Sequence, residues 1–223
     1  TKSVLTAIDL PGLMNWVIKG KVKDAAAKHI RQTTHPLLQV TGGSLAILNK
    51  HLTAQLIFGQ NFIGYYNTNS NGEYTQQVRC FQIIDTGEKL YVQPRKSVAP
   101  NPDYRRRDLN VVPVILNKKE VYIALSGVFT LDGGIWTVPV LINEDGTSSM
   151  ADPLDSLTFK QGMNNYASPT MTMYSRKTKD NYVVIFGGLS YGFFQGGVFQ
   201  TDGEIPFINQ ITTVKIDKKK NFS

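Results

Sequence analysis

The sequence has very little cysteine and histidine and no long hydrophobic run. Of its 223 residues, one is a cysteine, Cys80, and three are histidines, which excludes an intramolecular disulfide framework and a cysteine-rich zinc site. The longest apolar runs, such as residues 183–186, are far shorter than the roughly 18 residues of a membrane-spanning helix. We therefore expect no membrane span.

The sequence has instead the composition of strands and turns. Hydrophobic residues make up 41% and charged residues 18%, so a core can form and wholesale disorder is excluded. Aromatic and β-branched residues favour strands, and the 19 glycines favour turns. The 24 Lys and Arg against 17 Asp and Glu give a moderate net charge of +7. These features favour an all-β fold of about one domain.

One pattern occurs three times along the chain. An apolar run ends at Gly59, at Gly127 and at Gly187, with a spacing of about 60 residues. Each run follows another apolar run across a short polar turn and precedes a third, which predicts antiparallel hairpins. The expected strands are residues 43–48, 56–60, 78–84 and 89–93, then 111–116, 124–128 and 136–142, then 169–174, 184–188 and 211–216.

A unit of about 60 residues with four antiparallel strands is typical of one blade of a β-propeller. The apolar run into Gly187-Gly188, followed by spaced aromatic residues, resembles the kelch-type repeat of the galactose-oxidase-like central domain. Gly59 and Gly127 keep only the first glycine of that pair. The resemblance covers roughly residues 37–217 and implies kelch-like blades, about three and a half of them.

The resemblance implies a division of the chain. Residues 1–36 would be the outer part of a preceding blade with a short helix and a loop leading onward; 37–100, 101–158 and 159–223 would each be a blade, the last one lacking its final strand. Because such rings usually close with about six or seven blades, we expect a partial ring in a fragment of a longer protein. A collapsed sheet stack and closure by dimerisation are the alternatives.

The first 36 residues do not follow the repeat. Residues 4–10 are expected to form a strand that ends at Pro11-Gly12, and residues 13–18 a second strand. Residues 24–30 are expected to form a short helix that begins at Asp24.

The strand order places two kinds of loop on one face, namely those leading into the first strand of a blade and those between its second and third strands. Their arginines and amides could hydrogen-bond hydroxyl pairs, and their aromatic rings could stack on sugar faces. Long loops on a rigid scaffold are the usual carriers of binding. The candidate ligand-binding residues are Arg31, Tyr65, Tyr66, Arg105, Arg106, Arg107, Asn164, Asn165, Tyr191 and Phe193.

The most distinctive local feature is the triplet Arg105-Arg106-Arg107. It could bind a carboxylate or phosphate through forked hydrogen bonds. The alternative is ion pairing with Asp103 or Asp108. Consecutive side chains of an extended segment alternate in direction, so at most one or two of the three would face one ligand.

These observations favour a kelch-like binding module whose partner is a glycan or a protein. The alternatives are a carbohydrate-active or other hydrolytic enzyme with part of its site outside the chain, and a non-catalytic interaction scaffold. No catalytic residue, metal or cofactor is expected. Residues 67–73 have the spacing of a calcium loop without its acidic residues, and Cys80 has no histidine set to form the copper site of galactose oxidase.

Two further kinds of partner follow from the sequence. A polyanion could bind the basic turns, although such turns also keep strand edges soluble. An incomplete ring could self-associate. A secreted, periplasmic or cell-surface bacterial protein is favoured over a cytoplasmic one.

Overall fold

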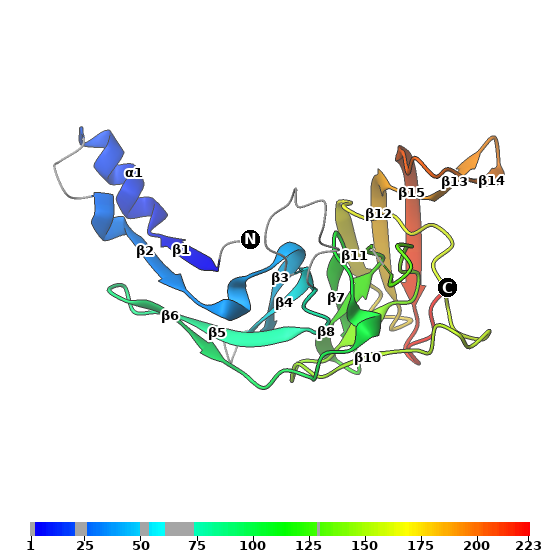
Figure 1. Ribbon diagram of the computed structural model, residues 1–223, viewed down its shortest axis with the longest axis horizontal. Coiled ribbons are helices and arrows are strands. Elements are labelled where there is room, and N and C mark those ends of the chain that lie inside the picture. Colours follow the sequence, from blue (N-terminus) through cyan, green and yellow to red (C-terminus); the bar gives the residue numbers. More distant parts are fainter. Residues whose placement is uncertain (1–2, 21–25, 50–53, 61–73, 129) are drawn as a thin grey trace.

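The computed structural model describes residues 3–20, 26–49, 54–60, 74–128 and 130–223 (Figure 1). Within these residues the fold is all-β, as predicted, and consists of several small antiparallel sheets, none of which closes on itself. Three of the sheets follow one another along the chain, and we call them sheets I, II and III. They form a stack, and a smaller N-terminal unit extends away from it.

Sheets I and II are four-stranded meanders in which each strand pairs with the next along the chain. Sheet I consists of β3 (Thr41–Asn49), β4 (Ala54–Gln60), β5 (Arg79–Asp85) and β6 (Leu90–Pro94). Sheet II consists of β7 (Asn110–Leu116), β8 (Lys119–Leu125), β9 (Val140–Ile142) and β10 (Ser148–Met150). Strands are present in each expected region, although β8 ends at Leu125 instead of residue 128 and β9 begins at Val140 instead of residue 136. β10 adds a strand that the sequence pattern did not predict.

Sheet III pairs its strands in the order β11-β12-β15. Its strands are β11 (Thr170–Tyr174), β12 (Asn181–Leu189) and β15 (Phe207–Ile216). A separate hairpin of β13 (Gly192–Gln195) and β14 (Val198–Thr201) lies between β12 and β15 in sequence. At the end of the chain, Phe222 forms an isolated antiparallel bridge with Ile216.

The core lies between the sheets, because sheet II is covered on both faces. Along β8, Tyr122 and Ala124 belong to a buried cluster that includes Cys80 of sheet I. Alternate residues such as Ile123 belong to a second cluster that includes Ile185 of sheet III. Successive side chains of a strand point to opposite faces, so one strand contributes to both interfaces. A strand covered on both faces is expected to be almost continuously apolar, as β8 is after Glu120.

The N-terminal unit departs from the sequence expectation. β1 (Val4–Ile8) pairs with β2 (Ile30–Thr34), and the expected second strand at residues 13–18 is wrong, because these residues belong to helix α1 (Leu10–Ile18). Pro11 does not end the segment, since proline is compatible with the first turn of a helix. Asp9 caps this helix by accepting a hydrogen bond from the Gly12 N–H at 3.1 Å.

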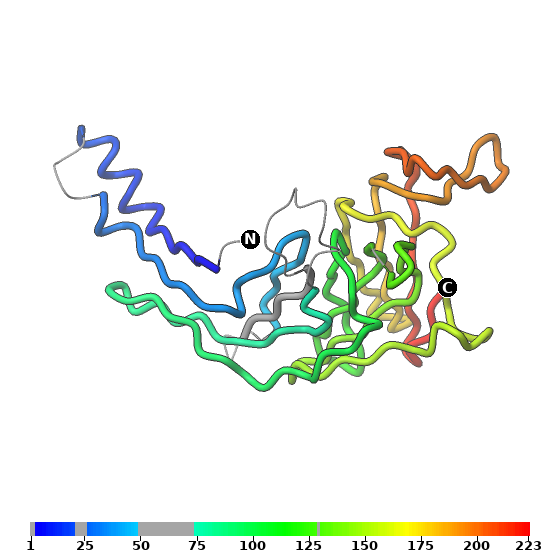
Figure 2. The backbone as a smooth tube through the Cα atoms, in the orientation of Figure 1, coloured from blue at the N-terminus to red at the C-terminus, as the bar shows by residue number. Residues whose placement is uncertain are grey.

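The part of the chain that the structure describes also contains three short 3-10 helices: η1 (Ala26–His29), η2 (Pro36–Leu38) and η3 (Pro102–Tyr104). η1 takes the place of the short helix expected over 24–30, whose proposed first residue, Asp24, lies outside the described residues. The backbone trace in Figure 2 shows the N-terminal unit at one end of the molecule and the β13–β14 hairpin at the other. No helix in the described part of the chain is long and apolar enough to cross a membrane.

Candidate functional site

The loops of sheets II and III meet at one edge of the stack. The loop leading into β7 bonds to the loop that follows β8, since the Val128 N–H donates to the Arg107 carbonyl at 2.9 Å. It also bonds to the loop leading into β11, whose Ala167 N–H donates to the Asp108 carbonyl at 3.0 Å. Tyr166 of that loop forms a bridge with Leu189 at the end of β12. The loops that carry most of the candidate residues therefore lie together.

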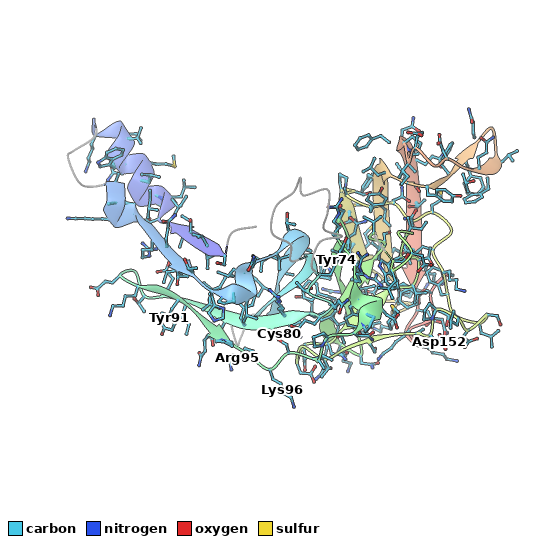
Figure 3. The ribbon with its side chains drawn as sticks, viewed as in Figure 1. Tyr74, Cys80, Tyr91, Arg95, Lys96 and Asp152 are labelled. Atoms are coloured by element: carbon cyan, nitrogen blue, oxygen red, sulfur yellow. The ribbon has the colours of Figure 1, made fainter. Side chains whose placement is uncertain are left out.

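The three consecutive arginines have three different environments. The Arg105 guanidinium lies 4.1 Å from the ring centre of Tyr74, which Figure 3 shows near the junction of sheets I and II. Arg107 forms an ion pair with Asp108, with Nε and Oδ2 3.0 Å apart. Burial nevertheless raises the pKa of Asp108, because the loss of solvation outweighs the Arg107 charge. The ion pair with Asp108, expected as the alternative to ligand binding, is therefore present and involves Arg107.

Arg106 lies inside the protein and is fully buried. Its guanidinium donates to the carbonyl oxygens of Ser126 at 3.1 Å and Val138 at 3.3 Å, and it lies 4.8 Å from the ring centre of Trp136. Burial lowers the pKa of Arg106 to about 9, since the charged form loses its hydration. This side chain links the loop that leads into β7 with the loop between β8 and β9. Because it is enclosed, a ligand in solvent does not reach it.

The amide candidates of the next loop are also enclosed. Asn164 and Asn165 are fully buried, and Gln161 is only 5% exposed. The Asn165 side chain donates to the Gly187 carbonyl at 2.7 Å, and Gln161 accepts from the Ser126 N–H at 2.9 Å. The side-chain nitrogen and oxygen of Asn164 have no hydrogen-bond partner among the described residues. Asn165 and Gln161 therefore satisfy backbone groups where sheets II and III meet.

The remaining candidates divide between separate places. Arg31 lies in β2, not in a loop, and forms a bidentate pair with Asp85, with bonds of 2.8 and 2.7 Å. Tyr65 and Tyr66 lie outside the described residues. Tyr191 and Phe193 lie at the start of the β13–β14 hairpin, and Tyr191 is exposed.

This hairpin carries exposed apolar side chains that the sequence reasoning did not select. Phe194, Val198 and Phe199 are between 46% and 62% exposed, and Phe207, just beyond the hairpin, is 80% exposed. The Phe194 and Phe199 rings meet edge to face with centres 5.5 Å apart. The signal that could have found it is Gly196-Gly197 between two apolar runs, because both glycines have positive φ, as a two-residue hairpin turn requires. We call Tyr191, Phe194, Val198, Phe199 and Phe207 the apolar patch.

A pocket of about 290 Å³ lies beneath this hairpin. Phe194 and Phe199 line it from the hairpin, and Thr212 and Val214 line it from β15. Met163 lines it from the loop that leads into β11. Its walls are mainly apolar side chains, which suits an apolar group better than a charged one.

The described residues offer no cluster for metal binding, and Cys80 is not activated. Within them, no three His, Cys, Asp or Glu side chains are grouped so that they could hold a metal ion. Cys80 is buried between sheets I and II, and burial raises the pKa of its thiol to about 11, which disfavours the thiolate needed for nucleophilic chemistry.

No protein-family model matches the chain, and no curated protein matches it.

Proposed function

We propose that the chain is a protein-binding module built from kelch-like propeller blades, with the apolar patch as its recognition surface. The observation that carries this proposal is the exposure of Tyr191, Phe194, Val198, Phe199 and Phe207 within one short stretch of chain. Contiguous exposed apolar groups mark interaction sites, and aromatic residues dominate the energetics of protein interfaces.

The propeller part of the proposal rests on the order and packing of sheets I, II and III. Sheets I and II are antiparallel sheets of successive strands, and sheet III pairs β12 with β15 across the β13–β14 hairpin. Two apolar clusters join the three sheets face to face. Such a stack supplies a rigid base from which the β13–β14 hairpin projects (Figure 1). The blade boundaries at residues 37–100, 101–158 and 159–223 belong to the same proposal.

A protein partner suits these residues better than a glycan does. Glycan binding needs accessible amides and guanidinium groups beside the rings. Here Arg106, Asn164 and Asn165 are buried, and Arg31 is paired with Asp85. What the hairpin presents to solvent is mainly apolar, and an apolar protein surface is its natural complement.

The test places a photo-cross-linking amino acid at position 198 in the native host and, separately, at position 154. Leu154 is the control because it is 91% exposed in another loop. The cross-linked partner is then purified, and its affinity is measured for Val198→Asp and for Leu154→Asp. We expect a discrete partner from position 198, and a loss of about tenfold or more for Val198→Asp alone.

Two results would contradict the proposal. One is a partner that cross-links equally at both positions and binds Val198→Asp as tightly as the wild type. The other is specific binding on a glycan array with no loss in Val198→Asp, which would favour carbohydrate recognition.

A further inference from the structure

Three turns meet at the end of the stack that lies opposite the β13–β14 hairpin (Figure 1). They are residues 117–118 between β7 and β8, 175–180 between β11 and β12, and 217–221 after β15. Asn181, the first residue of β12, pairs with Ile216 of β15. Its side-chain amide accepts from the Ile115 N–H at 2.7 Å and donates to the Ile115 carbonyl at 2.9 Å. The three strand ends are therefore at one level, and the turns beyond them are neighbours.

The two turns of sheet III concentrate positive charge. Residues 175–180 and 215–221 carry seven basic and two acidic side chains, a net charge of +5 in a chain whose total is +7. All the basic side chains within the turns are exposed, and none of them forms an ion pair with a described residue. We call them the basic face: Arg176, Lys177, Lys179, Lys218, Lys219 and Lys220.

The two acidic side chains are engaged inside these turns. Asp180 is buried and forms an ion pair with Lys215, with Nζ and Oδ2 3.2 Å apart. The Asp217 carboxylate accepts from the backbone N–H groups of Asn221 at 2.9 Å and Lys219 at 2.7 Å. The bonds from Asn221 are the main cause of the lowered pKa of Asp217. The carboxylates thus hold the turns in place, and positive charge is left facing the solvent.

Sheet II extends the same surface. Lys118 is exposed at the tip of the two-residue turn that joins β7 to β8. Lys119 adds no net charge, because it is paired with Glu144. The acidic side chains Glu120 and Asp145 border this side, so the positive charge is centred on sheet III. Solubility is served by charges of both signs interspersed, and a concentration of one sign indicates an anionic partner.

We propose that the basic face binds the surface of a membrane that contains acidic phospholipids. Its turns contain no aromatic or apolar residue, whereas proteins that bind single-stranded nucleic acid stack aromatic rings on the bases. The cations lie at the tips of turns from two packed sheets, and such sheets are about 10 Å apart, so the charge spreads in two directions. A bilayer presents anionic headgroups in a plane and can engage all of these cations at once.

This inference goes beyond the proposed function and does not depend on it. β12 runs from the basic face at Asn181 to Leu189, where the chain continues into the β13–β14 hairpin. The two surfaces therefore lie at opposite ends of sheet III, and a chain bound to a membrane through one would present the other to a protein partner.

The test measures binding of the full chain to phosphatidylcholine vesicles prepared with or without phosphatidylserine. Lys177→Gln/Lys219→Gln removes one charge from each turn of sheet III, at two exposed positions. Lys28→Gln/Lys160→Gln is the matched control, because it removes two exposed charges from η1 and from the loop that leads into β11. Lys177→Arg/Lys219→Arg keeps the charge of the basic face. Thermal unfolding verifies that each variant is folded.

We expect the wild type to bind only the vesicles that contain phosphatidylserine, and to be released as added salt screens the charges. A lysine near an anionic bilayer contributes about fivefold in affinity, so Lys177→Gln/Lys219→Gln should bind about 25-fold more weakly than the wild type. The control variant should lose much less, and the arginine variant should bind as the wild type does.

A wild-type protein that does not distinguish the two kinds of vesicle would overturn membrane binding through the basic face. Equal losses in the glutamine variant and its control would overturn it as well, because the location of the charge would then be irrelevant. Duplex DNA that stays bound at a salt concentration which releases the vesicles, and that is lost in the same glutamine variant, would replace the membrane with a nucleic acid.

Discussion

The N-terminal unit and the sheet stack are neighbours in one chain, yet they are held in different ways. No residue of 3–20 or 26–34 is buried, whereas sheet II contributes Val112, Ile123 and Leu125, all almost inaccessible, to a core shared with sheet III. The N-terminal unit relies on local hydrogen bonds, such as the 2.9 Å contact between Asp9 and His29. The comparison shows that side chains buried between sheets stabilise the stack. The N-terminal unit is instead positioned by the helix cap at Asp9 and by the pairing of β1 with β2.

The largest loss of unfolding free energy should come from shortening a side chain in the core that sheets II and III share. Ile123→Ala removes a fully buried side chain between sheets II and III and should cost about 2–5 kcal/mol of unfolding free energy. Val17→Ala on the half-exposed face of α1 should cost less than about 0.5 kcal/mol. Urea unfolding of both variants measures the contrast, and equal costs would mean that the two regions are not stabilised differently.

A glycine pair sharpens the same comparison. Gly188 in the stack and Gly20 after α1 both have positive φ, so alanine is strained at either position. At Gly188, however, the new Cβ would lie 2.7 Å from the Tyr166 carbonyl oxygen, whereas at Gly20 it meets nothing within 4 Å. We expect a loss of about 3 kcal/mol for Gly188→Ala and about 1 kcal/mol for Gly20→Ala. Thermal unfolding decides the matter, and the reverse order would refute the assignment of a close approach at Gly188.

The smallest effect concerns the link between the two regions. The Arg31 guanidinium lowers the pKa of Asp85 below its ordinary value of 3.8, mainly through their hydrogen bonds. A carboxyl group with a lowered folded pKa stabilises the folded state above its unfolded pKa, and this contribution disappears as the pH falls through the folded value. Arg31→Ala, or acid, should therefore expose the N-terminal unit to protease sooner while global unfolding barely changes.

Limited proteolysis followed by mass spectrometry checks this prediction, and Arg95→Ala is the control, since Arg95 bonds Gln82 within sheet I. Unchanged cleavage of Arg31→Ala at neutral pH would show that the ion pair does not position the N-terminal unit.

The strands of the stack could be predicted because each sequence signal is local. Val112, Val114 and Leu116 alternate with less buried residues, as a strand with one apolar face requires. Helix α1 was missed because Pro11-Gly12 was interpreted as a strand end. Leu10, Leu13, Met14 and Val17 have helical spacing, and this period was the available signal.

The candidate site was less predictable, because neighbours in sequence have unrelated environments. No feature of the neighbouring sequence distinguishes Arg106 from Arg105. Arg106 is fully buried, whereas the Arg105 guanidinium lies over the ring of Tyr74 near the junction of sheets I and II. Tyr191, a candidate ligand-binding residue, is exposed, while Phe194 and Phe199, whose exposure depends on how the hairpin lies on β15, were not among the candidates.

The sequence by itself determined that this chain forms antiparallel strands, because side-chain alternation and turn residues act over a few positions. Tertiary structure alone decided which polar side chains are enclosed and which apolar ones face solvent. Burial depends on what packs against a residue from elsewhere in the chain, as the Val138 carbonyl and the Trp136 ring do against Arg106.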